Sequence, residues 1–138
     1  MQLSASISTI MTKDVHTIDV SQSLYDVQEV FETKNVRHIP VLKESKLAGI
    51  ISKTDLKRLS FGQAVGDGDR DVAIFDMLSI DQVMNDKVHT VSPNATIEEV
   101  ATQLAKEEYH ALPVAENGEL KGIVSTTDMI QFLLDNRA

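Results

Sequence analysis

The chain contains no cysteine and no tryptophan, and only 4% of its 138 residues are aromatic. The absence of cysteine excludes disulfides and thiolate metal ligands, and it fits a reducing compartment. With so few aromatic side chains, the hydrophobic core must be mainly aliphatic. No apolar run is long enough to span a bilayer, and the first residues carry no signal-peptide pattern. We therefore expect a cytoplasmic protein with no membrane partner.

Positively charged residues are also scarce in this chain. It has 13 Lys and Arg residues against 21 Asp and Glu residues, so the formal net charge is −8. Nucleic acids and anionic membranes are bound by clustered Lys and Arg side chains, so we expect no nucleic-acid partner. The four histidines lack the spacing and the carboxylate neighbours of a metal site, and no metal ligand is predicted.

The most informative feature that is present is an internal duplication. The stretch from Ile7 to Leu56 aligns without a gap with the stretch from Ile80 to Met129. A repeat of about 55 residues buries only a modest part of its surface alone, so we expect the two copies to share a core. Most of the identical positions cluster in three motifs, which are Val-His-Thr (15–17 and 88–90), Pro-Val (40–41 and 113–114) and Gly-Ile-x-Ser-x-Thr-Asp (49–55 and 122–128).

Hydrophobic periodicity predicts the order β-α-β-β-α in each copy, and therefore a mixed α+β fold. A helix follows a capping-box pair in each copy, and an Asn-Gly turn in the second copy predicts a hairpin between the next two strands. We expect first strands at Val15–Val20 and Val88–Val91, first helices after Ser23 and Thr96, hairpin strands near 38–42 and 47–52 and at the equivalent positions of copy two, and last helices from near Thr54 and Thr127.

The duplication also predicts the domain organisation. We expect a single module over residues 1–138, with repeat one over about 4–60 and repeat two over about 77–137. Between them, the glycines and acidic residues from Gly62 to Asp71 predict a linker over about 61–72.

The three motifs, in this order and present twice, resemble a tandem pair of cystathionine-β-synthase (CBS) domains, or Bateman module. The resemblance covers nearly all of the chain outside the linker, and it implies two β-α-β-β-α repeats packed with pseudo-two-fold symmetry. It also implies a regulatory module that binds AMP, ADP, ATP or S-adenosylmethionine in the inter-repeat cleft and signals to an unidentified regulated protein. No obligatory cofactor and no catalytic residue are implied, and many family members form homodimers.

The resemblance further implies which residues bind the ligand. It assigns the Ser and Asp of the third motif to the ribose, and the backbone before each Pro to the adenine. The helix that follows each serine also presents unpaired N–H groups that favour an anion. The predicted ligand-binding residues are Thr17, His38, Ile39, Pro40, Ser52, Lys53, Thr54 and Asp55 in copy one, and Thr90, His110, Leu112, Pro113, Ser125, Thr127 and Asp128 in copy two.

Two other interpretations of the same residues remain open. Ser-x-x-Asp before an apolar helix is also an ordinary capping box, which stabilises the helix by about 1 kcal/mol and binds nothing. The chain would then be a non-catalytic dimerisation or protein-interaction module with vestigial ligand sites. Surplus apolar positions on the last helices, at Leu56, Leu59, Ile130, Phe132 and Leu133, favour an isologous dimer. A small Asp- and His-dependent enzyme is disfavoured, because neither a Ser-His-Asp arrangement nor a P-loop is found.

The two predicted sites differ in charge. Copy one carries Arg37, His38, Lys53, Lys57 and Arg58, where copy two offers His110 and, nearby, Lys121 as its basic residues. A phosphate on an acidic protein needs local cations, so we expect the first site to favour phosphorylated ligands, with Lys53 as the phosphate ligand. The sequence does not identify the effector or the regulated protein, and no catalytic or transport domain is recognised in it.

Overall fold

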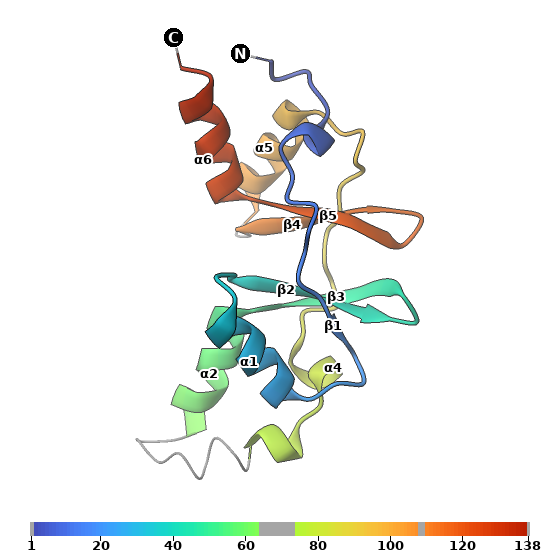
Figure 1. Cartoon of the computed structure of the whole chain (residues 1–138), viewed down its shortest axis with the longest axis vertical. Coiled ribbons are helices and arrows are strands. Elements are labelled where there is room, and N and C mark those ends of the chain that lie inside the picture. Colours follow the sequence, from blue (N-terminus) through green and yellow to red (C-terminus); the bar gives the residue numbers. More distant parts are fainter. Residues whose placement is uncertain (1, 64–73, 108–109, 138) are drawn as a thin grey trace. The chain divides into compact units, whose positions relative to one another are not determined.

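In a computed structural model, the chain divides into two compact units (Figure 1). The structure describes residues 2–63, 74–107 and 110–137. One unit spans residues 16–87, and the other combines residues 1–15 with residues 88–138. We call them the 16–87 unit and the 88–138 unit, and the second name always includes residues 1–15. Residues 64–72 of the predicted linker, and Tyr109, lie outside the described residues, whereas residues 61–63 belong to a helix.

The 16–87 unit has a three-stranded sheet in the order β1-β2-β3, with β1 parallel and β3 antiparallel to β2. Figure 1 shows α1 and α2 on the same side of this sheet. Leu24, Val27 and Phe31 of α1 pack there against Ile39 and Ile51 of the sheet. The elements are β1 (Ile18–Asp19), α1 (Leu24–Thr33), β2 (His38–Lys43), β3 (Lys46–Ser52), α2 (Lys53–Gln63) and α4 (Ile80–Val83).

The 88–138 unit repeats this plan with one strand reduced. Its antiparallel pair β4–β5 is joined by a parallel bridge from Val91 to Val114, which occupies the place of β1. Val100 and Leu104 of α5 pack against Leu112, Val114 and Val124 of the sheet. The elements are the 3₁₀ helix η1 (Ile7–Thr9), α5 (Ile97–Lys106), β4 (Ala111–Glu116), β5 (Glu119–Ser125) and α6 (Thr126–Asp135).

The order β-α-β-β-α is therefore confirmed in both copies, but the predicted first strands are too long. Only Ile18 and Asp19 pair with β2, and only Val91 forms the equivalent bridge. The alternating pattern of these segments favours an extended chain. A strand forms only where a neighbouring backbone lies within hydrogen-bonding distance, and here the pairing begins at Ile18 with Val41, although β2 itself begins at His38.

Capping boxes and turns form where the sequence places them. Ser23 caps α1 with Asp26, and Thr96 caps α5 with Glu99. The β4–β5 turn has φ angles of 55° and 82° at Asn117 and Gly118, as an Asn-Gly hairpin turn requires. Glu44 and Ser45 adopt the same left-handed region in the β2–β3 turn, with φ angles of 52° and 67°. The second repeat therefore has the less strained turn.

The leading segments of the two repeats, residues 5–12 and 78–85, are exchanged between the units. Ile7 is fully buried in the core of the 88–138 unit, and Ile80 is fully buried in the core of the 16–87 unit. Thr12 exchanges backbone hydrogen bonds of 2.9 and 3.0 Å with Ile123, and Asn85 exchanges bonds of 2.9 and 3.0 Å with Ile50. Each of the two hydrophobic cores therefore contains residues of both repeats, and in this sense the two copies share their cores.

Two glycines allow this close approach. A Cβ atom at Gly49 would lie 2.8 Å from the carbonyl oxygen of Asn85, and one at Gly122 would lie 2.7 Å from that of Thr12. Both distances are shorter than an unstrained contact, so the exchanged segment can pair with β3 or β5 only where the strand has no side chain. The glycine that opens the third motif is therefore needed for the leading segment to pair with the strand.

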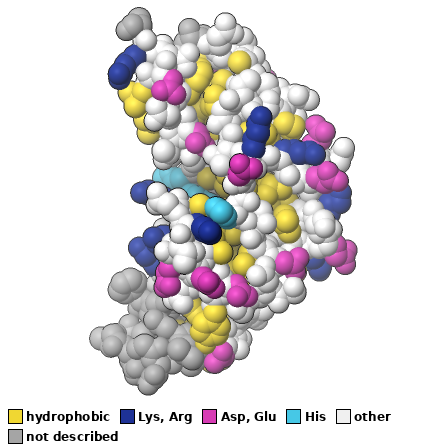
Figure 2. All heavy atoms as spheres, viewed as in Figure 1, with side chains coloured by type: hydrophobic (Ala, Val, Ile, Leu, Met, Phe, Trp, Pro, Cys, Tyr) yellow, Lys and Arg dark blue, Asp and Glu magenta, His cyan; other side chains and the backbone are white. Residues whose placement is uncertain are grey.

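Among the described residues, neither surface charge nor helix length adds a further structural feature to the two units described above. On the face shown in Figure 2, Lys and Arg side chains are interspersed with Asp and Glu side chains. No helix within the described residues combines the length and the apolar character needed to cross a bilayer.

Candidate functional site

The predicted residues of the first repeat meet at one end of the sheet in the 16–87 unit. His38 lies opposite Ser52 in the β2–β3 register, and Pro40 lies opposite Ile50. Because Ile18 pairs with Val41 in parallel, Thr17 falls at the level of Pro40. The backbone N–H of Lys53 donates to the carbonyl of Arg37 over 2.8 Å, which fixes the start of α2 beside β2.

The second repeat builds the same arrangement within the 88–138 unit. Ser125 lies opposite Ala111, and the backbone N–H of Thr126 donates to the carbonyl of His110 over 2.9 Å. Val91 pairs with Val114, so the exposed Thr90 lies at the level of Pro113. Each predicted set therefore lies wholly inside one unit.

Not every predicted residue can offer its side chain. Ile39 and Leu112 are buried in the two cores, and both prolines are buried as well. A ligand could meet these residues only through their backbone, which is the role the sequence predicted. The side chains of Lys53, Thr54, Thr127 and His110 are exposed, and His38 is half-buried.

The Ser and Asp of the third motif form capping boxes in both units. The Asp55 N–H donates to Ser52 Oγ over 3.0 Å, and the Ser52 N–H donates to Asp55 Oδ2 over 3.1 Å. In α6, the Asp128 N–H donates to Ser125 Oγ over 3.1 Å and the Ser125 N–H to Asp128 Oδ2 over 2.9 Å. The capping interpretation of Ser-x-x-Asp therefore describes the local geometry, at a value of about 1 kcal/mol for each helix.

Capping does not occupy all the polar atoms of these residues. Each aspartate uses Oδ2 alone in its box, and a carboxylate can accept further hydrogen bonds at the other oxygen. Oδ1 of Asp55 lies 3.9 Å from Arg58 Nη1, beyond hydrogen-bonding distance. Each serine hydroxyl accepts one N–H and can still donate its own hydrogen. The boxes thus hold a carboxylate and a hydroxyl in place for a second partner.

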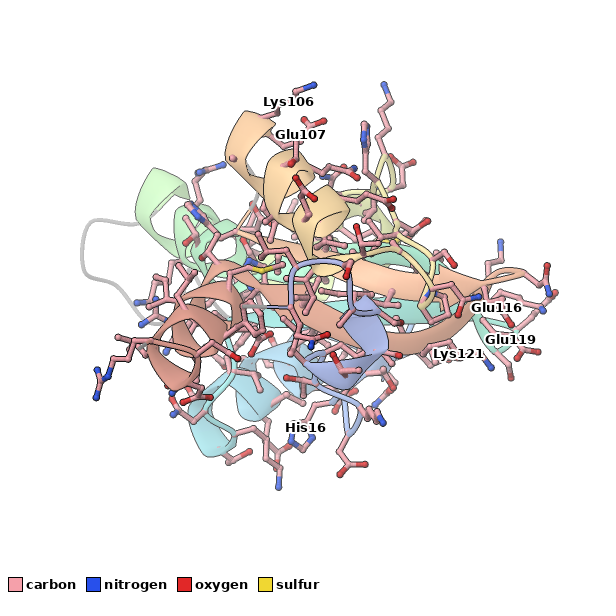
Figure 3. The ribbon with its side chains drawn as sticks, turned by 90° about the horizontal axis from the view of Figure 1, so that it is seen from above. His16, Lys106, Glu107, Glu116, Glu119 and Lys121 are labelled. Atoms are coloured by element: carbon pink, nitrogen blue, oxygen red, sulfur yellow. The ribbon has the colours of Figure 1, made fainter. Side chains whose placement is uncertain are left out.

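Basic side chains surround the first site more than the second. The side chains of Arg37, Lys53 and Lys57 are exposed close to the start of α2. The expectation that Lys121 supplies charge to the second site is wrong, because it lies toward the turn end of β5. There its Nζ is 3.4 Å from Glu119 Oε2 (Figure 3). Strand direction explains the error: Lys121 and Ser125 stand near opposite ends of one strand.

One pocket of about 260 Å³ touches the predicted site. It lies between α2 and the segment that contains α4, and of the predicted residues only Asp55 lines it. Arg58 and Gln82 provide further polar groups, and its apolar lining is formed by Leu59, Leu78 and Val83. The contribution of residues 78–83 was not predicted, because these residues belong to the second repeat in the sequence.

Two titratable groups outside the predicted site have a shifted pKa. The hydroxyl and then the backbone N–H of Ser21 lower the pKa of Asp19, while apolar surroundings and then Asp76 raise the pKa of Tyr25. Nδ1 of the exposed His89 lies 3.6 Å from Oε1 of the half-buried Glu107, and Figure 3 shows Glu107 at the end of α5. Within residues 2–63, 74–107 and 110–137, no three His, Cys, Asp or Glu side chains gather as a metal site would require.

The duplicated fold and its paired motifs agree with a comparison of protein families. The sequence profile of the CBS domain matches residues 7–62 and again residues 80–135. The chain belongs to the CBS domain family. Its two CBS domains form a CBS pair, as the resemblance of the motifs predicted.

Proteins similar to this chain differ in what surrounds the matching region. Inosine-5′-monophosphate dehydrogenase of Thermoplasma acidophilum is 30% identical over 123 residues, which cover 88% of this chain but only 22% of the enzyme. The CBS pair of MJ0100, solved with 5′-methylthioadenosine and S-adenosyl-L-methionine, matches with a TM-score of 0.80 at 21% identity over 96% of this chain and 98% of that one. CBSX2, solved with AMP, matches with a TM-score of 0.79 at 23% identity over 95% and 97%. At these identities the two structures establish the fold, and the enzyme shares only about a fifth of its length with this chain.

Proposed function

We propose that this CBS pair is a regulatory module that binds an adenosine compound and transmits the occupied state to a partner protein by a conformational change. The observation that carries the proposal is the geometry of Asp55 and Asp128. Each carboxylate is fixed by its capping box through one oxygen, so that the other can accept a ribose hydroxyl without a loss of side-chain entropy on binding.

The ligand class follows from three further features. The two CBS pairs of similar fold were solved with AMP and with S-adenosyl-L-methionine, which share the adenosine group. Thr17 and the backbone before Pro40 lie at the same end of the sheet as Ser52. The N–H groups that open α2 and α6 favour an anion, so a phosphate or carboxylate on the ligand would be accommodated.

The two sites are proposed to differ in preference. Lys53 is exposed inside the third motif of copy one, and Thr126 takes its position in copy two. We assign phosphorylated adenosine ligands to the site of Ser52 and Asp55. A less charged adenosine compound suits the site of Ser125 and Asp128 better.

A thermal-shift screen with AMP, ADP, ATP, S-adenosyl-L-methionine and NADH tests the ligand class. A ligand at 100 times its dissociation constant stabilises the native state by about 2.7 kcal/mol. By calorimetry, Lys53→Ala is expected to weaken AMP and ATP about two- to fivefold, the range of an exposed ion pair. The matched control, Lys43→Ala at the turn end of β2, should leave the affinity unchanged. Unchanged affinity in Lys53→Ala would disprove the assigned role of that residue.

A second candidate function is dimerisation with vestigial ligand sites. It is favoured by the large apolar side chains on α6, since Ile130, Leu133 and Leu134 are 57%, 50% and 47% exposed. The surplus predicted at Leu56, Leu59 and Phe132 is not found. Leu56 is buried in the core of the 16–87 unit and Leu59 packs against it, while Phe132 is buried in the core of the 88–138 unit. We therefore propose a homodimer that uses α6. A flat response to every compound in the screen, from a protein that self-associates, would favour this alternative.

A further inference from the structure

In each unit a methionine of the exchanged segment lies against a glycine of the sheet. A Cβ atom at Gly49 would lie 2.7 Å from Met84 Sδ, and one at Gly122 would lie 2.8 Å from Met11 Sδ. The sulfur atoms thus occupy the space that a side chain would fill. Each contact is formed inside one unit, between residues of different repeats.

The two contacts are equivalent in the duplication. Met11 and Met84 occupy matching positions in the leading segments, and the next residue of each segment pairs with β5 or β3. Both side chains are half-buried, so each packs against a core and still presents part of its surface to solvent. Each thioether therefore lies next to the backbone hydrogen bonds that join its leading segment to β5 or β3.

We propose that Met11 and Met84 form a paired oxidation site, at which conversion to the sulfoxide loosens the leading segments from the sheets. The oxidant is a peroxide. The sulfur donates an electron pair to one oxygen of hydrogen peroxide, the O–O bond breaks and an S–O bond forms. The proton of the transferred hydroxyl passes to the departing hydroxide, which leaves as water. The thioether is oxidised by two electrons and the peroxide is reduced by two. Methionine sulfoxide reductases reverse the change.

The packing explains why these two methionines respond. A sulfoxide is polar and carries one more oxygen atom than the thioether, yet the glycine side of each sulfur has no room even for a methyl carbon. The oxidised side chain must turn away from the sheet, and the segment loses its contact with the glycine. Met77 differs because it is 78% exposed, so its oxidation breaks no such contact.

This site is independent of the proposed ligand. It needs no adenosine compound, and its residues are not among those assigned to ligand binding. Loosening would begin at Thr12 and Asn85, whose backbone groups pair with Ile123 and Ile50. A module with such a site would respond to peroxide as well as to its ligand.

The test treats the full chain with hydrogen peroxide and follows each methionine by peptide mass spectrometry. Amide exchange and thermal unfolding are recorded on the same samples. We expect exchange at Thr12, Ile50, Asn85 and Ile123 to accelerate about tenfold or more as Met11 and Met84 are oxidised, with a lower unfolding midpoint. Reduction by methionine sulfoxide reductases should restore both.

Two variants separate the proposal from general damage. Met11→Leu/Met84→Leu keeps the side-chain volume nearly unchanged and should retain its exchange pattern and midpoint in peroxide. Met77→Leu should respond as the wild type does. The proposal is overturned if the leucine variant loses as much protection as the wild type. It is also overturned if wild-type Met11 and Met84 stay reduced while Met77 is oxidised, or if they become sulfoxides without faster exchange.

Discussion

Replacing Ile7 with alanine is expected to destabilise the 88–138 unit, although Ile7 belongs to the first sequence repeat. The side chain is fully buried there among Ile97, Val100 and Val124. Removing a buried isoleucine side chain to alanine costs about 2–5 kcal/mol, because apolar contacts are lost and a cavity remains. Denaturant unfolding should show the loss, and amide exchange should rise most in α5, β4 and β5.

The equivalent change in the second repeat should affect the other unit. Ile80→Ala empties a fully buried position in the core around Leu24 and Ile51, so exchange should rise most in α1, β2 and β3. Leu3→Ala is a control for Ile7, because Leu3 is an exposed apolar residue four positions earlier in the chain. If Ile7→Ala instead loosened β2 and β3 while β4 and β5 kept their protection, the placement of residues 5–12 in the 88–138 unit would be wrong.

Adding a single methyl group at Gly49 or Gly122 should have the second largest effect. The new Cβ atom would meet both the sulfur of a methionine and a carbonyl oxygen of the paired backbone, all within 2.8 Å. Overpacking of this kind typically costs about 1–3 kcal/mol. We expect Gly49→Ala and Gly122→Ala to lower the free energy of unfolding by that amount, with faster amide exchange at Asn85 or Thr12.

A double variant identifies which neighbour carries the cost. Gly49→Ala/Met84→Ala removes the sulfur but keeps the Asn85 carbonyl at 2.8 Å, so rescue of stability should be incomplete. Lys43→Ala, at the exposed end of β2, controls for the general effect of an alanine on this sheet. Wild-type stability in both glycine variants would show that the segments do not approach the strands so closely.

Local structure could be predicted because its signals are local. The capping boxes at Ser23 and Thr96 begin α1 and α5, and Asn117-Gly118 turns the β4–β5 hairpin. The position of Ser52 and Asp55 at one end of the sheet could also be predicted, because both residues follow directly at the end of a predicted strand. The shortness of β1 could not, because it depends on where the first segment comes close enough to β2 to pair with it.

The exchange of leading segments could not be predicted because the duplication itself conceals it. Ile7 and Ile80 occupy the same position in the two copies, so each could complete its own copy or the other with the same pattern of apolar residues. Only three-dimensional contacts separate the two cases. The role of Gly49 was hidden for the same reason, since its neighbours Met84 and Asn85 come from the other repeat. The pocket residues Leu78 and Gln82 were missed likewise.

The capping and ligand interpretations of the third motif are compatible in the structure. Asp26 provides the comparison, since it closes a capping box with Ser23 that was assigned no ligand. Asp55 and Asp128 close the same box at the ends of their sheets where Thr17 or Thr90 and the Pro-Val motif are also found. Asp26 thus differs from Asp55 and Asp128 in the residues around its capping box. Substitution of each aspartate by asparagine can measure this difference.

Calorimetric titration of AMP into the wild type, Asp55→Asn, Asp128→Asn and Asp26→Asn tests the proposed function most directly. Asparagine keeps an oxygen that can accept the capping N–H but loses the carboxylate charge. A hydrogen bond to a charged group is worth about 1.5–3 kcal/mol, so we predict a roughly 10- to 150-fold loss of affinity in Asp55→Asn, with a smaller or no loss in Asp128→Asn. Asp26→Asn should bind as the wild type does. Equal affinity in all four proteins, or no binding by any of them, would contradict adenosine recognition by the third motif.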